Sequence, residues 1–124
     1  MTDHSATVVL IAHGSRADAA NDAHRTTCAE LSERIDRRVL PAFLELAEPT
    51  IGAAIASAAD AGATSVLVVP YFLLPGNHTA RDIPALVDDA RRHHPGLRID
   101  LSSYVGAEPA MLDVVADVIT RGLP

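Results

Sequence analysis

The sequence predicts a single α/β domain with a four-stranded parallel sheet and helices on both of its faces. Short apolar runs alternate with longer amphipathic segments along the whole chain, which is typical of a βα series. The 124 residues fit one domain of common size, without a linker, a low-complexity stretch or an internal repeat. Apolar residues make up 48% of the chain and aromatic residues only 3%, so Ala, Val, Leu and Ile must fill the core.

Four apolar runs have the length and composition of strands. They cover residues 7–12, 39–44, 65–69 and 97–103. The first and third are continuously apolar, as expected for central parallel strands that are covered on both faces. The second contains Pro41, which lacks an N–H and favours an edge, and the fourth alternates apolar with polar residues. With right-handed crossovers these features predict the strand order 2-1-3-4 of a flavodoxin-like sheet.

The segments between and after these runs carry helical signals. The predicted helices cover residues 18–37, 49–61, 82–94 and 109–120. Pro49 is a favoured first-turn residue, and the cations Arg91 and Arg92 suit the C-terminal end of the third helix. Spacings of three and four residues predict which helical side chains face the core. These are Cys28, Leu31 and Ile35, then Ile83, Leu86, Val87 and Ala90, and finally Leu112, Val115 and Ile119.

Charge and cysteine usage exclude several classes of protein. The net charge is −6, and the ten basic residues, all Arg, form no long basic run, so nucleic acid is an unfavourable partner. The apolar run 8–12 is too short to span a bilayer, and the N-terminus lacks the basic start of a signal peptide, so we expect a cytoplasmic protein without a membrane partner. Cys28 is the one cysteine, which rules out an intrachain disulfide and favours a buried thiol.

Three polar residues lie just after predicted strands. His13 follows the first strand, Glu45 ends the second, and His78 lies in the predicted loop 71–82 after the third. The carboxyl ends of parallel strands meet at one edge of the sheet, where ligands of such folds bind, so the three side chains can converge. Two imidazoles and a carboxylate form a usual ligand set for a divalent first-row metal. Pattern alone leaves the alternative of solvated loop histidines open.

A nucleophile is the weaker interpretation of the first loop. Ser15 lies two residues after His13, but the sequence has no Gly-x-Ser-x-Gly turn between a strand and a helix. The loop also lacks the glycine pattern of a phosphate-binding or dinucleotide-binding motif.

Four segments, in this order and at this spacing, resemble the small sirohydrochlorin chelatases of the cobalamin and siroheme pathways. They are AHGSR at 12–16, FLELAEPTI at 43–51, GAT at 62–64, and VPYFLL at 69–74 with His78 and DIP at 82–84. The resemblance implies a chelatase-like fold and a lyase in which His13 and His78 bind metal and remove protons with the help of Glu45. It implies Co²⁺ or Fe²⁺ as the inserted metal, with Ni²⁺ as a further option, and no permanently bound cofactor. It also implies a homodimer, because long relatives hold two such domains and this chain holds one.

A tetrapyrrole substrate would need an apolar wall and anion-binding groups. The wall would come from Tyr71, Phe72, Leu73 and Leu74, and the donors to ring carboxylates from Arg16 and Arg81. The remaining expected contacts are made by loop residues Gly14, Ser15, Gly76 and Asn77. Many relatives carry a basic residue where this chain has Asn77, which weakens the expectation of a ring-carboxylate contact there. Two rival functions remain: a metal carrier or sensor that uses the same histidines, and an interaction domain without metal.

Overall fold

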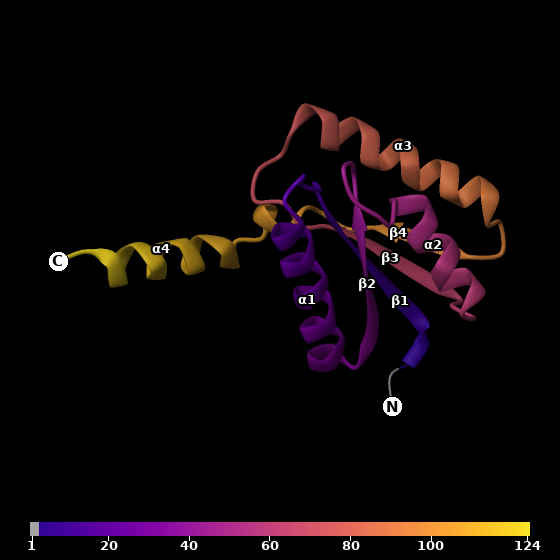
Figure 1. Cartoon of the computed structure of the whole chain (residues 1–124), viewed down its shortest axis with the longest axis horizontal. Coiled ribbons are helices and arrows are strands. Elements are labelled where there is room, and N and C mark those ends of the chain that lie inside the picture. The colour runs from indigo at the N-terminus through magenta and orange to yellow at the C-terminus, as the bar shows by residue number, and fades with distance from the viewer. Residues whose placement is uncertain (1–2) are drawn as a thin grey trace.

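The four strands of the computed structural model form one parallel sheet in the order β2-β1-β3-β4, as the sequence predicts. The structure describes the backbone of residues 3–124 and the side chains of residues 5–76 and 80–124. The strands are β1 (Asp3–Ala12), β2 (Arg37–Phe43), β3 (Ser65–Pro70) and β4 (Arg98–Leu101). The helices are α1 (Asp18–Ile35), α2 (Ile51–Asp60), α3 (Asn77–His93), the short 3₁₀ helix η1 (Val105–Ala107) and α4 (Ala110–Gly122) (Figure 1).

Both predicted edge strands lie at the edges. Pro41 sits on β2 opposite Leu10 of β1, and an edge strand tolerates the missing N–H of a proline because one of its sides has no partner strand. On β4, Ile99 is buried while Arg98 and Asp100 are exposed, which is the alternation of a strand with one covered face. The central strands β1 and β3 pair continuously from Ala6 with Ser65 to Ile11 with Pro70.

The main core lies on the face of the sheet that α2 and α3 cover. Its strand residues are Val9, Ile11, Ala42, Val66, Val68 and Ile99, and its helix residues are Ile51, Ala54, Ile55, Ala58, Ile83, Val87 and Ala90. Three of the four residues predicted to face inward from the third helix are therefore buried. The fourth prediction, Leu86, is wrong, because that side chain is 41% exposed.

A smaller core lies on the opposite face, beneath α1. It joins Cys28 to Leu10 and Val39, with Leu31 packed against them, so the predicted burial of the thiol is confirmed. Ile35 was expected on the same face but is 46% exposed, because the helix ends at this residue and Asp36 takes a left-handed conformation at φ 51°.

Two helix starts differ from the prediction. The second helix begins at Ile51, since the Oγ1 of Thr50 accepts the N–H of Ala53 as an N-cap and leaves Pro49 outside. The third helix begins at Asn77, five residues before its predicted start, and the N–H of Ala80 already donates to the carbonyl of Gly76. The expected loop 71–82 therefore ends at Gly76.

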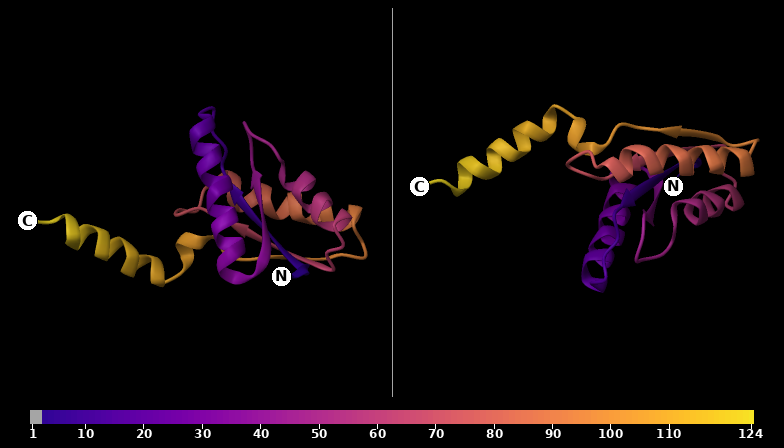
Figure 2. Two further views of the ribbon diagram at one scale, coloured as in Figure 1. Left: turned by 60° about the horizontal axis from the view of Figure 1, so that its bottom comes forward. Right: turned by 90° about the horizontal axis from the view of Figure 1, so that it is seen from above.

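The prediction that α4 packs inward is wrong. The helix projects away from the rest of the chain in every view (Figure 1, Figure 2). It has no buried residue, and Leu112, Val115 and Ile119 are 75%, 45% and 55% exposed. The periodicity identified an apolar stripe correctly but could not say what covers it. None of the helices in the described part of the chain combines the length and apolar character needed to cross a membrane.

Candidate functional site

The ends of β1 and β2 place His13 and Glu45 side by side. Beyond the last strand pair, the N–H of Leu44 donates to the carbonyl of Ala12 and the N–H of Glu45 to the carbonyl of His13, both at 3.1 Å. The two side chains then approach each other, with 3.5 Å between His13 Nε2 and Glu45 Oε1. They are 60% and 59% exposed, so a cation and its water ligands can reach both.

A pocket of about 290 Å³ opens beside this pair. It is lined by His13, Leu44, Glu45, Asp82 and Leu86. Asp82 brings a second carboxylate to the pocket from the first turns of α3, and its Oδ1 lies 3.8 Å from the Nε of Arg81. Asp82 was not among the site residues predicted from the sequence. Its signal was available in the DIP segment, but the predicted helix start at residue 82 hid that Asp82 lies more than one turn inside α3.

Gly14 allows the loop after β1 to lie in close contact with the loop after β2. Its φ is +96°, and a Cβ at this position would overlap the carbonyl oxygen of Glu45. A side chain at residue 14 would therefore push the two loops apart, and with them the His13 and Glu45 side chains. Leu46, directly after Glu45, also has a positive φ of 65°, which is an uncommon conformation for a residue with a side chain.

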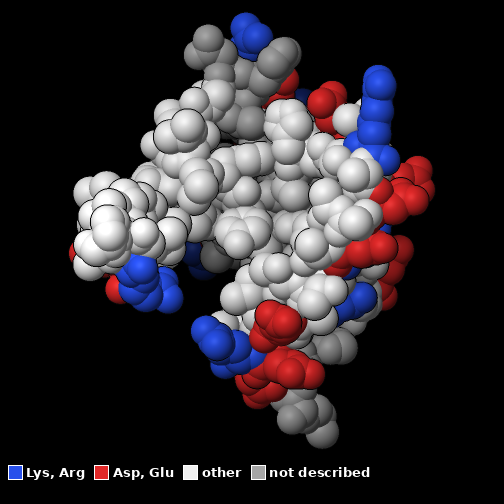
Figure 3. Space-filling view, turned by 60° about the vertical axis from the view of Figure 1, so that its left-hand side comes forward, with Lys and Arg blue, Asp and Glu red and all other residues white. Residues whose placement is uncertain are grey.

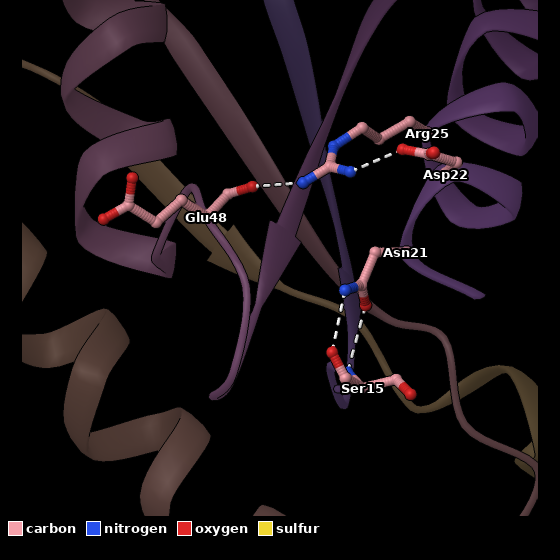
Figure 4. A network of polar contacts seen from close by, with 5 residues as sticks. All are labelled: Ser15, Asn21, Asp22, Arg25 and Glu48. Carbon is pink, nitrogen blue, oxygen red and sulfur yellow. Dashed lines mark hydrogen bonds and ion pairs between the residues drawn. The ribbon is translucent and has the colours of Figure 1, made fainter. Parts of the chain in front are cut away.

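The loop after His13 is held by a side chain of α1. Asn21 is buried, its Oδ1 accepts the N–H of Ser15 at 3.0 Å, and its Nδ2 donates to the carbonyl of Ser15 at 2.8 Å (Figure 4). The two bonds satisfy both backbone groups of one loop residue. The hydroxyl of Ser15 accepts the N–H of Ala17 and thus serves the turn into α1. Sequence reasoning missed Asn21, because an Asn in a helix usually marks only a polar face.

The loop after β2 is tied to the same helix by Arg25. One guanidinium nitrogen donates to the carbonyl of Glu48 at 2.8 Å, and another pairs with Asp22 at 2.8 Å (Figure 4). The guanidinium also lies over the ring of Phe43, 5.1 Å from its centroid. Helix α1 therefore holds both loops that carry the His13–Glu45 pair.

Beneath the site, His24 is a buried structural histidine. The sequence pattern places it near the apolar stripe of α1 as a boundary residue between the apolar and polar faces, whereas it is 7% exposed and its Nε2–H donates to the carbonyl of Leu10 at 2.9 Å. Its ring lies 5.3 Å from that of Phe43 and is stacked 6.0 Å from that of Tyr71. Burial lowers the pKa of His24, which favours the neutral ring, and burial likewise raises the pKa of the neighbouring Cys28 thiol to about 11.

The segment after β3 presents apolar side chains at the same end of the sheet. Tyr71, Leu73 and Leu74 are 45%, 62% and 80% exposed, and the ring of Phe72 meets that of His13 edge to face at 6.2 Å. A broad surface without charged side chains, bordered by acidic and basic ones, faces the viewer at this end of the molecule (Figure 3). The predicted apolar wall is therefore exposed next to the pair.

The predicted site residues differ in how far the structure describes them. His13 and Glu45 lie together, while Arg16 and Arg81 are exposed at the margin. The side chains of Asn77 and His78 fall outside the described part of the structure. Their backbone opens α3. Among the side chains that are described, no group of three His, Cys, Asp or Glu residues is close enough to enclose a metal ion.

Fold and site together define an open parallel α/β domain that presents a pair of potential metal ligands at the carboxyl ends of β1 and β2. The sequence model of the CbiX family matches residues 7–121. The chain belongs to the CbiX family.

The chain is also similar to several relatives that are named as sirohydrochlorin chelatases. The chain is 34% identical to a chloroplastic sirohydrochlorin ferrochelatase of Arabidopsis thaliana over 94% of its own length and 52% of the relative's. It is 33% identical to a sirohydrochlorin cobaltochelatase of Methanopyrus kandleri, over 94% of this chain and 96% of that one. It spans about half the length of the Arabidopsis protein and 56% of a cobaltochelatase of Methanococcus maripaludis.

Solved structures agree with the fold. A cobalamin biosynthesis CbiX protein from Marinobacter aquaeolei superposes with a TM-score of 0.82 at 28% identity, covering 94% of this chain and 95% of that one. The sirohydrochlorin chelatase SirB from Bacillus subtilis subspecies spizizenii, in complex with cobalt, superposes with a TM-score of 0.80 at 27% identity. In that comparison the match covers 95% of this chain and 51% of SirB.

Proposed function

We propose that this chain is a chelatase that inserts Co²⁺ or Fe²⁺ into sirohydrochlorin or a closely related tetrapyrrole. The observation that carries the proposal is the pairing of His13 and Glu45, 3.5 Å apart at the carboxyl edge of a CbiX-family sheet. Relatives named as cobaltochelatase and as ferrochelatase support the substrate class and leave both metals in the proposal.

Metal insertion releases two protons from the pyrrole nitrogens of the ring, and the site has groups suited to receive them. A neutral imidazole accepts a proton near neutral pH, which is the role proposed for His13. Glu45 adds a negative charge that attracts the incoming cation. His78, in the first turn of α3, is proposed as the second ligand and proton acceptor. The metal is a substrate here, and no permanently bound cofactor is part of the proposal.

A weakly enclosed metal suits this chemistry, because the ion must leave the protein for the ring. The described side chains offer a pair of adjacent ligands rather than a closed set, and both are more than half exposed. Open coordination positions are what distinguish transfer and catalytic sites from structural ones. Tyr71 to Leu74 are proposed to contact the ring face, and Arg16 and Arg81 its carboxylates.

We also propose that the active form is a homodimer. The pocket beside His13 measures about 290 Å³, at the lower limit of about 300 Å³ for drug-sized ligands, and a tetrapyrrole is larger. The apolar wall of one copy is also open to solvent, with Leu74 80% exposed. A second copy that closes over the bound ring would bury both the ring and Leu74.

The test follows the absorbance of sirohydrochlorin with Co²⁺ or Fe²⁺ under anaerobic conditions, with protein and with a protein-free blank. The expected result is a conversion to the metallated spectrum that is faster with protein and scales with its concentration. An unchanged rate at all protein concentrations contradicts the proposal.

The rival function, a metal carrier, makes a different prediction in the same experiment. A carrier would bind Co²⁺, as measured by calorimetry without the ring, yet leave the rate of spectral change at the level of the blank. Metal binding without acceleration would therefore favour the carrier.

A further inference from the structure

Asp82 reaches the pocket of the candidate site from a different element than His13 and Glu45 do. The pair follows β1 and β2, whereas Asp82 lies in the second turn of α3. Leu44 and Leu86 supply the rest of the lining, and Leu44 packs against the main core. Two carboxylates and one imidazole therefore border one small space between the edge of the sheet and α3.

The three polar side chains of the pocket are too far apart to bind one ion directly. His13 Nε2 and Glu45 Oε1 are 3.5 Å apart. Within the part of the chain whose side chains are described, no three His, Cys, Asp or Glu residues are near enough to enclose a metal ion, so Asp82 is not a third ligand of an ion held by the pair. Its carboxylate can act on that ion only through an intervening group, and a hydrated cation brings such a group with it, namely its water.

The volume of the pocket suits a cation that still carries water. The pocket measures about 290 Å³. A divalent first-row ion in water commonly holds about six oxygen ligands, and six water molecules at about 30 Å³ each occupy about 180 Å³. A hydrated ion therefore fits inside the pocket, whereas a tetrapyrrole is too large to enter it.

The charges around the pocket favour a cation. Among the described residues, its lining contains two carboxylates and no Arg. Arg81 lies beside Asp82, with 3.8 Å between its Nε and Asp82 Oδ1, but the Arg81 side chain is 77% exposed and water screens much of its charge. Near a protein surface, a carboxylate that is separated from a divalent ion by one water molecule, about 5 Å away, strengthens binding on the order of tenfold.

We infer that Asp82 holds the incoming divalent cation through the water ligands of that ion, while His13 and Glu45 bind the ion directly. The purpose of this capture rests on the proposed chelatase function, but the capture itself precedes the ring and can be measured without it. Asp82 lowers the metal concentration at which the site fills. Because it forms no direct bond to the ion, it adds no bond that must break when the ion leaves the protein for the ring.

Titration of the protein with Co²⁺ alone, followed by calorimetry and by the visible absorption of the bound ion, tests this role. Asp82→Asn keeps the shape and loses the charge, and should raise the Co²⁺ dissociation constant about tenfold. Its absorption spectrum at saturation should match that of the wild type, because no direct ligand is removed. Asp82→Glu keeps the charge and should bind Co²⁺ within about threefold of the wild type. Raising a non-coordinating salt from about 0.1 M to about 1 M shortens the Debye length from about 10 Å to about 3 Å, so the difference between the wild type and Asp82→Asn should shrink.

Asp89→Asn is the matched control. It removes the same charge from the same helix, seven residues and about 10 Å further along, where the side chain does not line the pocket. This variant should keep the wild-type Co²⁺ dissociation constant. With sirohydrochlorin present, Asp82→Asn should raise the KM for Co²⁺ about tenfold and leave kcat unchanged, since Asp82 acts before the ion is transferred. Circular dichroism checks that each variant is folded, and Asp82→Gln replaces Asp82→Asn if the latter unfolds.

Three results would overturn the inference. The first is equal Co²⁺ affinity of the wild type and Asp82→Asn. The second is a changed absorption spectrum of Asp82→Asn at saturation, because Asp82 would then be a direct ligand. The third is an equal loss of affinity in Asp89→Asn, which would indicate only the overall charge of the helix. If Asp82→Asn shows the expected loss but the wild type does not accelerate insertion, the inference is supported and the chelatase proposal is contradicted.

Discussion

The His13 side chain, more than half exposed and held by loops, has little packing to lose. His13→Ala should therefore shift the free energy of unfolding by about 0.5 kcal/mol or less. The rate of metal insertion should fall about a hundredfold or more, because the change removes a ligand and a proton acceptor together. Glu45→Gln should give an intermediate rate, since it keeps the shape but loses the charge. His93→Ala, an exposed histidine at the far end of α3, is the matched control and should retain the wild-type rate. Insertion by His13→Ala at the wild-type rate would refute the assignment.

Asn21 supports the site indirectly, through its two hydrogen bonds to the backbone of Ser15 in the loop after His13. Asn21→Ala leaves both backbone groups of Ser15 without their partner, and should lower the free energy of unfolding by about 1–3 kcal/mol in urea titrations. Asn21→Asp keeps the acceptor for the Ser15 N–H but sets a buried carboxylate oxygen against the Ser15 carbonyl oxygen, so we expect a loss at least as large as that of Asn21→Ala. Equal stabilities of the wild type and Asn21→Ala would show that the loop finds other partners.

Among the residues of the candidate site, mainly those at strand ends could be predicted from the sequence. His13 and Glu45 could be placed together because parallel strands finish at one edge. Asn21 and Arg25 could not be assigned their roles, because each contacts a loop whose path depends on the fold of the whole edge. Asp82 was hidden by a helix start that no cap residue marks in the sequence.

The loops after β1 and β2 meet at Gly14. A comparison of Gly14 with Gly62 can separate the cost of a positive φ from the cost of a steric overlap. Gly14 and Gly62 have similar positive φ values, +96° and +93°, but only at Gly14 would a Cβ meet another atom within 4 Å. Both Ala variants incur the cost of positive φ, about 1–2 kcal/mol. Gly14→Ala should be less stable than Gly62→Ala by a further 1–3 kcal/mol or so, because the loop after β2 must move. Thermal or urea unfolding of both variants measures the difference, and equal losses would show that the loop yields freely.

Helices and strands were predictable where burial sets their period. The stripe Ile83, Val87 and Ala90 identified the buried side of α3, and Pro41 identified an edge strand. The apolar stripe of α4 was equally clear in the sequence, but the surface that covers it was not. Periodicity predicts that one face of a helix is apolar and does not predict which element packs on that face.

For the molecule as a whole, two buried titratable groups of α1, His24 and Cys28, contribute to the pH dependence of stability. Because burial lowers the pKa of His24, the unfolded chain binds the extra proton more readily, and stability should fall as the pH drops below the ordinary histidine value of about 6.5. Because burial raises the pKa of Cys28 from 9.0 to about 11, the unfolded chain loses its proton first, and stability should fall as the pH rises between these values. Urea titrations from pH 5 to pH 11 should show a plateau between the two limbs. Cys28→Ala should flatten the alkaline limb, and an unchanged limb would assign it to other groups.

The central place of β1 has a consequence for refolding. Both of its neighbours come later in the chain, and Thr64 reaches back 59 residues to bond the carbonyl of Ser5, so no local hairpin can protect this strand early. Until β3 arrives, the run from Val8 to Ile11 is an unpaired apolar segment rich in β-branched residues, which is the composition that associates between chains. Dilution from denaturant should therefore yield native protein at low concentration and increasing aggregate at high concentration, with β1 as the segment through which the chains first join.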